Sequence, residues 1–237
     1  MAMAQARPGR QARARARQGL LTLPAMLLAG GVALAVGYIA YVLWPRWPAE
    51  PVALDAPSIP VTVGSVTFNV PPAAIRRPVQ RRPGTQERID LAYLWPSLEP
   101  PDPAARPEPV TAPGALDRVF VTVAVADGLT PAERIRTIYP RYLDSRAAEG
   151  FGGLAVQPFR AGTPYQGEEL ILDPAGGRFA ARCSQNGPGP ALGICLYERR
   201  IGDADVTVRF PRDWLSDWRG VEQKLDRLIA QFHATGG

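Results

Sequence analysis

The chain contains one long apolar run, GLLTLPAMLLAGGVALAVGYIAYVL, which extends from Gly19 to Leu43. Because an α-helix rises about 1.5 Å per residue, a helix over this run would be roughly 37 Å long, enough to cross a hydrocarbon core with some tilt. Aromatic rings, which favour the lipid headgroup layer, gather at its C-terminal end: Tyr38, Tyr41, Trp44 and Trp47. The run therefore predicts a transmembrane helix over residues 19–43.

The charges on either side of the run predict its orientation. No acidic residue precedes it, whereas several arginines do: Arg7, Arg10, Arg13, Arg15 and Arg17. The positive-inside tendency then places residues 1–18 in the cytoplasm and residues 45–237 in the periplasm or an equivalent extracytoplasmic space. A cleaved signal peptide is the alternative, but its apolar core would be shorter, about 7–15 residues, and followed by a small-residue cleavage site. We expect an uncleaved anchor in the bacterial inner membrane.

The net charge of +5 and the sequence pI near 9.6 suggest an anionic partner such as a nucleic acid. The five arginines of the N-terminal tail account for this whole excess, since the rest of the chain has 22 basic and 22 acidic residues. The exported part is formally neutral, so its composition does not support nucleic-acid binding.

The exported part contains both cysteines of the chain, Cys183 and Cys195. A close pair in an oxidising compartment is typical of a disulfide, and the spacing does not fit a CxxC redox motif. Two buried reduced thiols are the alternative. No histidine or further cysteine completes a zinc site, and we expect no metal or other cofactor.

Proline positions divide the exported part into segments. Five prolines over residues 45–60 predict an extended spacer, and seven prolines over residues 96–114 predict a linker or long surface loop. The predicted organisation is a basic cytoplasmic tail (1–18), the transmembrane helix (19–43), a proline-rich spacer (44–60), a membrane-proximal segment containing strands (61–114) and an α+β domain (115–237).

Apolar periodicity predicts the elements of these segments. Strands are expected over residues 61–70, 89–95, 118–126, 154–160, 168–172, 178–184, 193–200 and 204–210, and short turns between the last five favour an antiparallel meander. A capping box, Thr130-Pro131-Ala132-Glu133, predicts a helix that Pro140 must kink or split.

The clearest soluble helix follows the last strand, with Asp213 as its expected N-cap. Its apolar stripe comprises Trp214, Trp218, Val221, Leu225, Leu228 and Phe232. A coiled coil would need more heptads, so we expect this helix to pack on the meander. The predicted fold class is α+β: a transmembrane helix, then a β-meander packed by a C-terminal amphipathic helix.

Residues that could support catalysis are sparse. His233 is the only histidine and lies at the end of a helix, where a dipole interaction is the ordinary role. Glu168 and Glu169 are adjacent in a strand and must point to opposite faces, whereas Asp203 and Asp205 flank a hairpin turn, where aspartate is common. We therefore predict a protein that is not an enzyme; a membrane-tethered, carboxylate-dependent hydrolase is the alternative.

Two features suggest contacts with partners. Arg76, Arg77, Arg81 and Arg82 form a basic patch that could bind lipid phosphate or an anionic envelope polymer, although Glu87 and Asp90 could instead pair with these arginines. In the anchor, small residues recur at helical spacing: Ala25, Ala29, Ala33 and Gly37. Such a face permits close helix–helix packing, although an alanine-rich chain can also produce it by chance.

Several stretches share a further likeness: NVPPAAIR (69–76), RIDLAYLWP (88–96), YQGEEL (165–170) and RFPRDWLSDWR (209–219). Together they resemble a family of bacterial membrane-anchored proteins that have one transmembrane helix and an exported α+β domain. No activity is assigned to that family, so the resemblance implies an architecture and no catalytic residues.

These observations favour an exported domain that binds a protein or envelope component as a scaffold or accessory subunit. The partner would be another membrane or envelope protein, or a second copy of the chain bound through the transmembrane helix. A ligand-sensing domain is a third hypothesis, but the expected cytoplasmic tail of 18 residues has no domain to receive a signal, so a partner would have to relay it.

Overall fold

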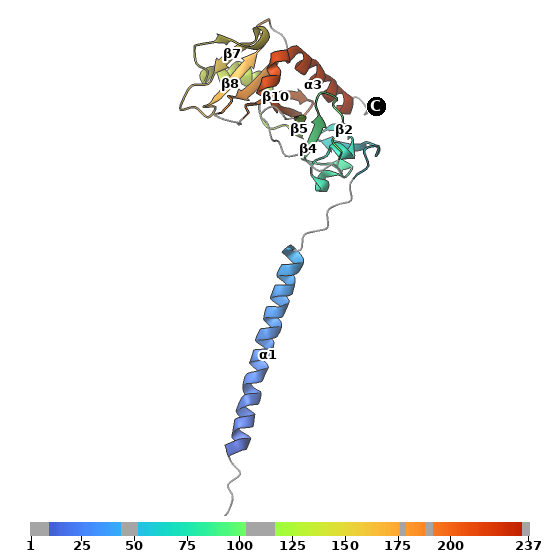
Figure 1. Cartoon of the computed structure of the whole chain (residues 1–237), viewed down its shortest axis with the longest axis vertical. Helices are drawn as coiled ribbons and strands as arrows, with labels where there is room; N and C mark the ends of the chain where they lie inside the picture. Colours follow the sequence, from blue (N-terminus) through green and yellow to red (C-terminus); the bar gives the residue numbers. More distant parts are fainter. Residues whose placement is uncertain (1–9, 44–51, 103–116, 176–178, 188–191, 234–237) are drawn as a thin grey trace, which may run out of the picture. The chain divides into compact units, whose positions relative to one another are not determined.

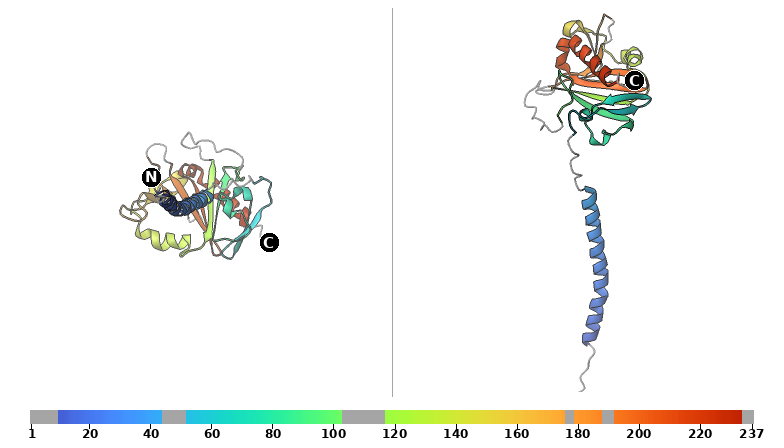
Figure 2. Two further views of the ribbon diagram at one scale, coloured as in Figure 1. Left: turned by 90° about the horizontal axis from the view of Figure 1, so that it is seen from below. Right: turned by 90° about the vertical axis from the view of Figure 1, so that its right-hand side faces the viewer.

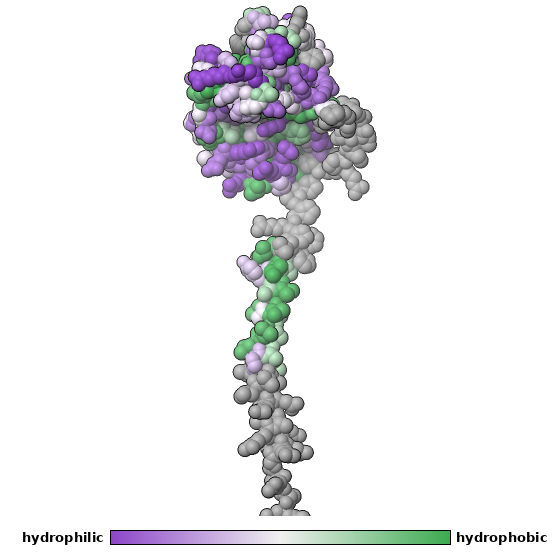
Figure 3. All heavy atoms as spheres, turned by 90° about the vertical axis from the view of Figure 1, so that its left-hand side faces the viewer, coloured by the Kyte–Doolittle hydropathy of each residue, from purple (hydrophilic) through white to green (hydrophobic). Residues whose placement is uncertain are grey.

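An apolar helix, α1 (Arg10–Leu43), begins the part of the chain that the computed structural model describes, which is residues 10–43, 52–102, 117–175, 179–187 and 192–233 (Figure 1). Within α1, the stretch Pro24–Val42 is long and apolar enough to cross a membrane. The chain divides into two units, Met1–Ala49 and Glu50–Gly237. Apolar side chains surround the α1 stretch, whereas hydrophilic side chains cover much of the visible face of the second unit (Figure 3).

An antiparallel sheet of eight strands forms the centre of the second unit. Its order is β4 (Arg88–Leu94), β5 (Arg118–Val125), β11 (Ala204–Pro211), β10 (Ile194–Ile201), β9 (Ala180–Ser184), β8 (Glu168–Leu172), β7 (Ala155–Pro158) and β6 (Ala148–Glu149). The predicted meander is confirmed, because β7 to β11 are consecutive neighbours. The sheet also joins β4 to β5, so the segments predicted as 61–114 and 115–237 contribute to one structure.

A smaller sheet has the order β2 (Val66–Val70), β1 (Ile59–Val63), β3 (Gly84–Thr85). The single strand predicted over residues 61–70 is wrong, because the chain reverses at Gly64-Ser65 and Val63 pairs with Val66. Gly64 has φ +62°, which a residue without a side chain adopts at little cost. Gly-Ser is a known two-residue hairpin turn, so the sequence contained this signal.

The C-terminal helix α3 (Trp218–His233) packs on one face of the large sheet (Figures 1 and 2). Leu225 and Leu228 from α3 join Val121, Tyr197 and Val208 from the strands in the main hydrophobic core. This confirms the predicted α+β class. The expected N-cap at Asp213 is wrong, because a 3₁₀ segment, η6 (Arg212–Asp217), precedes the α-helix.

Short helical turns complete the second unit. η1 (Pro72–Ala74) and η2 (Pro78–Gln80) precede β3, and η5 (Phe151–Gly153) precedes β7. Between β5 and β6, the chain forms α2 (Pro131–Glu133), a π-helical turn η3 (Arg134–Ile138) and a 3₁₀ turn η4 (Tyr139–Arg141). Pro140 lies in η4, where the α-helical pattern has already ended, as the missing N–H predicts.

A disulfide joins β9 to β10. Cys183 and Cys195 are register partners in the two strands, and their sulfur atoms are 2.03 Å apart. The bridge closes the connection between these strands, of which residues 188–191 lie outside the described residues. The aromatic residues Trp44 and Trp47, much of the predicted 44–60 spacer and residues 103–114 of the predicted linker also lie outside them.

Candidate binding groove

The face of the large sheet opposite α3 is covered in part by α2, η3 and η4, which we call the helical cover (residues 131–141). Figure 2 shows the yellow-green cover and the red α3 on opposite sides of the sheet. The helical cover begins at the predicted capping box, which the structure confirms. Thr130 Oγ1 accepts a hydrogen bond from the Glu133 N–H, and Glu133 Oε2 accepts one from the Thr130 N–H at 2.8 Å.

A small aromatic cluster holds the far end of the helical cover against the sheet. Tyr139 is buried, with its ring centroid 5.4 Å from that of Phe159 and 5.2 Å from that of Tyr165, both in edge-to-face geometry. Leu170 of β8 completes the buried part of this cluster. Edge-to-face pairs of this kind add to the stabilisation from area burial, so they hold the C-terminal end of the helical cover against the sheet.

A groove of about 660 Å³ opens between the helical cover and strands β8, β9 and β10. Strand alternation supplies its apolar floor, which contains Leu170, Leu172, Ala180 and Leu196. Residues of the cover, among them Pro131, Ala132, Ile135 and Arg136, form one wall.

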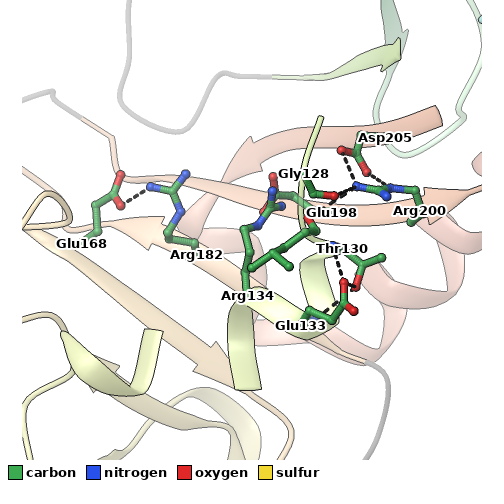
Figure 4. A network of polar contacts seen from close by, with 10 residues as sticks. Gly128, Thr130, Glu133, Arg134, Glu168, Arg182, Glu198, Arg200 and Asp205 are labelled. Carbon is green, nitrogen blue, oxygen red and sulfur yellow. Dashed lines mark hydrogen bonds and ion pairs between the residues drawn. The ribbon is translucent and has the colours of Figure 1, made fainter. Parts of the chain in front are cut away.

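Four of the six charged side chains that line the groove are in ion pairs: Arg182, Glu198, Arg199 and Arg200. Figure 4 shows the pairs of Arg182, Glu198 and Arg200. Arg134 Nη2 lies 3.0 Å from Glu198 Oε2, and Arg182 pairs with Glu168. Arg200 Nε lies 2.6 Å from Asp205 Oδ1, and its Nη2 also donates to the Gly128 and Leu129 carbonyls. These pairs neutralise most of the charge at the groove and leave much of its apolar floor accessible.

The protonation states at the groove are correspondingly fixed. Burial lowers the pKa of the Arg182 guanidinium, but the hydrogen bond and the charge of Glu168 outweigh it, so the pKa is raised overall. Hydrogen bonding to Asp205 raises the pKa of Arg200, and burial raises the pKa of Tyr139. Hydrogen bonds from Thr130 lower the pKa of Glu133. None of these groups would exchange a proton near neutral pH.

The carboxylates considered for catalysis are separated by the fold. Glu168 and Glu169 point to opposite faces, as predicted: Glu168 pairs with Arg182 and Glu169 pairs with Arg212. Among the residues that the structure describes, no group of three or more His, Cys, Asp or Glu side chains comes together as a metal site.

Asp203 and Asp205 also have different partners. Asp203 accepts hydrogen bonds from the Ser65 N–H at 2.8 Å and the Ser65 hydroxyl at 2.7 Å, which ties the β10–β11 turn to the β1–β2 turn. Asp205 pairs with Arg200. His233 lies in the last turn of α3, with its ring centroid 5.9 Å from that of Phe68.

The four arginines of the predicted basic patch do not share one surface contact: Arg76 and Arg77 contact side chains of β5 and β4, whereas Arg81 contacts a backbone carbonyl. The Arg76 guanidinium lies 4.6 Å from the centroid of the Phe120 ring, and Arg77 Nε lies 3.3 Å from Asp90 Oδ2. Arg81 instead donates from Nε to the Ile75 carbonyl at 3.1 Å, and Arg82 is exposed. The role of these four residues in binding stays a prediction.

The small-residue face of α1 is exposed in the first unit. Ala25, Ala29, Ala33 and Gly37 line a shallow apolar groove together with Leu28, Val32 and Val36. A Cβ atom added at Gly37 would meet no atom within 4 Å. The face is therefore open to a second helix, and its use in packing stays a prediction.

Comparison with known proteins identifies the fold. No protein-family model matches the chain, and no curated protein matches its sequence. The structure is similar to that of Smlt3025, an immunity protein of the Stenotrophomonas maltophilia type IV secretion system, with a TM-score of 0.53 and 16% identity over 78% of this chain and 99% of that one. The Neisseria meningitidis iron-regulated outer membrane lipoprotein FrpD matches with a TM-score of 0.39 and 13% identity over 79% of this chain and 97% of that one. The first similarity establishes a shared fold.

Proposed function

We propose that this chain is a non-enzymatic, single-pass protein of the bacterial envelope whose exported unit binds another protein through the groove. The observation that carries this proposal is the ion pairing of most charged side chains at the groove, beside an open apolar floor that is available for contact. An acid–base enzyme would instead need a carboxylate free to exchange protons. Here Glu168, Glu198 and Asp205 are each held by a guanidinium, and Asp173 accepts a hydrogen bond from the Ala175 N–H.

The fold supports a protein as the partner. The Stenotrophomonas protein that shares it is described as an immunity protein of a secretion system. We infer the same general mode, recognition of a protein at the cell envelope, for the present chain. An apolar floor with a polar rim also matches the anatomy of protein–protein interfaces.

The anchor supports a fixed location for this binding. We infer that α1 remains uncleaved in the inner membrane with residues 1–18 in the cytoplasm, because the arginines lie on one side of the apolar stretch and the disulfide lies on the other. A reporter that fluoresces only in the cytoplasm should stay dark when it is fused after Gly237. An N-terminal tag that is missing from the mature protein would instead show a cleaved signal peptide.

Photo-crosslinking in the native host tests the groove. Benzoylphenylalanine replaces Arg136, which is exposed and lines the groove, and in the control it replaces Arg227, which is exposed on α3. We expect a discrete protein adduct from position 136 only, and its loss when Ala132→Trp narrows the groove. Equal labelling from both positions, or no adduct above that of a chain carrying only the anchor, would refute the proposal.

A further inference from the structure

A cluster of arginines lies beside the groove, on the same face of the sheet. Phe120 of β5 is half-buried there and is the register partner of Arg209 on β11. Arg76 stacks on the Phe120 ring from the segment before η2. Arg76 and Arg209, far apart in the sequence, therefore both lie beside Phe120. We call Arg76, Arg77, Arg88 and Arg209 the arginine cluster.

One carboxylate orders most of this cluster. Asp90 is only 4% exposed, and its Oδ1 accepts from Arg88 Nη2 at 2.7 Å and from the Thr122 hydroxyl at 3.1 Å. Arg77 Nε lies 3.3 Å from Oδ2 of the same residue. Thr122 Oγ1 in turn accepts from Arg209 Nη1 at 3.1 Å. The guanidinium groups are thus held in place before any ligand arrives.

The cluster has more positive than negative charge. The acidic side chains of β4 and β11 on this face already have arginine partners: Asp90 pairs with Arg77 and Arg88, and Asp205 pairs with Arg200. Arg76 contacts the Phe120 ring and Arg209 contacts Thr122, and neither contact neutralises a charge. The four arginines of the cluster and the carboxylate of Asp90 therefore leave a local excess of three positive charges.

The arginine cluster continues directly into the groove. Leu196, which lines the groove, is the register partner of Arg209 on one side and of Arg182 on the other. Phe120, Arg209, Leu196 and Arg182 are thus successive register partners on four adjacent strands, and the last two of them line the groove. A partner seated in the groove would reach Arg209 without leaving this face.

We propose that the arginine cluster binds the carboxylates of an acidic segment of the protein partner, next to the part of the partner that occupies the groove. This inference rests on the proposed function. Arginine matches a carboxylate with paired hydrogen bonds, and side chains that are already ordered lose less entropy on binding. The half-buried Phe120 and Leu196 between the cations add apolar contact, which favours a peptide segment over an isolated phosphate headgroup.

Fluorescence anisotropy with a labelled oligoglutamate peptide tests the proposal, using the full chain in neutral detergent at low salt. Arg76→Gln combined with Arg209→Gln should weaken binding about tenfold or more. The matched control, Arg219→Gln combined with Arg227→Gln, removes the same charge from exposed positions of α3, on the opposite face of the sheet, and should change binding less than about twofold. Arg209→Lys keeps the charge but not the paired donors, and should give an intermediate loss.

Three results would overturn the proposal: no binding by the wild-type chain, equal weakening in the two double variants, or cluster-dependent binding of phosphatidylglycerol vesicles with peptide binding unchanged. An unchanged melting temperature shows that the variants are folded. The two hypotheses fail separately. If position 136 crosslinks a partner but peptide binding does not depend on the cluster, only the proposal for the arginine cluster is refuted. If peptide binding depends on the cluster but position 136 crosslinks no partner, only the proposal for the groove is refuted.

Discussion

Leu225 offers the most direct test of how α3 holds the second unit together. Its side chain is 0% exposed and lies in the main core, between α3 and the strands of the large sheet. Leu225→Ala removes three carbon atoms, which corresponds to about 2.4 kcal/mol of lost transfer free energy at roughly 0.8 kcal/mol per methylene. The cavity left behind adds to this loss, and measured Leu→Ala costs are about 2 to 5 kcal/mol. We expect a loss of about 3 kcal/mol in the free energy of unfolding.

Near-ultraviolet circular dichroism of the full chain in detergent measures this loss, because the signal comes from packed aromatic rings and not from α1. For a unit of this size, each kcal/mol corresponds to a change of about 2–4 °C in Tm, so Leu225→Ala should lower Tm by about 6–12 °C. Gln223→Ala is the matched control, since Gln223 is exposed on the same helix and should change stability by less than about 0.5 kcal/mol. If both variants melt within about 1 °C of each other, α3 does not pack on the sheet as described.

Three further perturbations test other contacts. Burial raises the pKa of Asp90, but hydrogen bonds from Arg88 and Thr122 and the charges of Arg88 and Arg77 lower it overall. The ionised Asp90 carboxylate therefore stabilises the fold above the unfolded pKa of about 3.9, and this contribution is lost as pH falls through the folded pKa. Asp90→Asn should lower Tm at pH 7 and flatten the decline of Tm between about pH 5 and pH 2. Asp55→Asn, at an exposed position, should change neither the Tm at pH 7 nor its decline with pH. Removing the disulfide with Cys183→Ser and Cys195→Ser should cost about 3 kcal/mol by the chain-entropy estimate, and dithiothreitol should lower the Tm of the wild-type chain but not that of the variant. Ala33→Ile should weaken self-association of α1 in a membrane two-hybrid or energy-transfer assay, while Leu34→Ile, one position along the same helix, should not; equal signals would count against the small-residue face.

Most individual elements could be predicted because their signals are local. The alternation in Val206 to Phe210 predicts a strand, the Thr130 capping box predicts a helix start, and the apolar spacing from Trp218 to Phe232 predicts one buried face of a helix. The reversal at Gly64-Ser65 was missed because continuous alternation on both sides looked like one strand.

The sequence by itself determined the N-terminal apolar helix, the charge balance and the α+β class, since each depends on composition or on spacing within a short window. Only the tertiary structure decided that β5 pairs with β11 and β4 with β5. That pairing places Arg209 between Phe120 and Leu196, its register partners on the two neighbouring strands, and Leu196 lines the groove. No local pattern encodes such a neighbourhood, because strand order depends on which apolar faces bury one another across long stretches of chain.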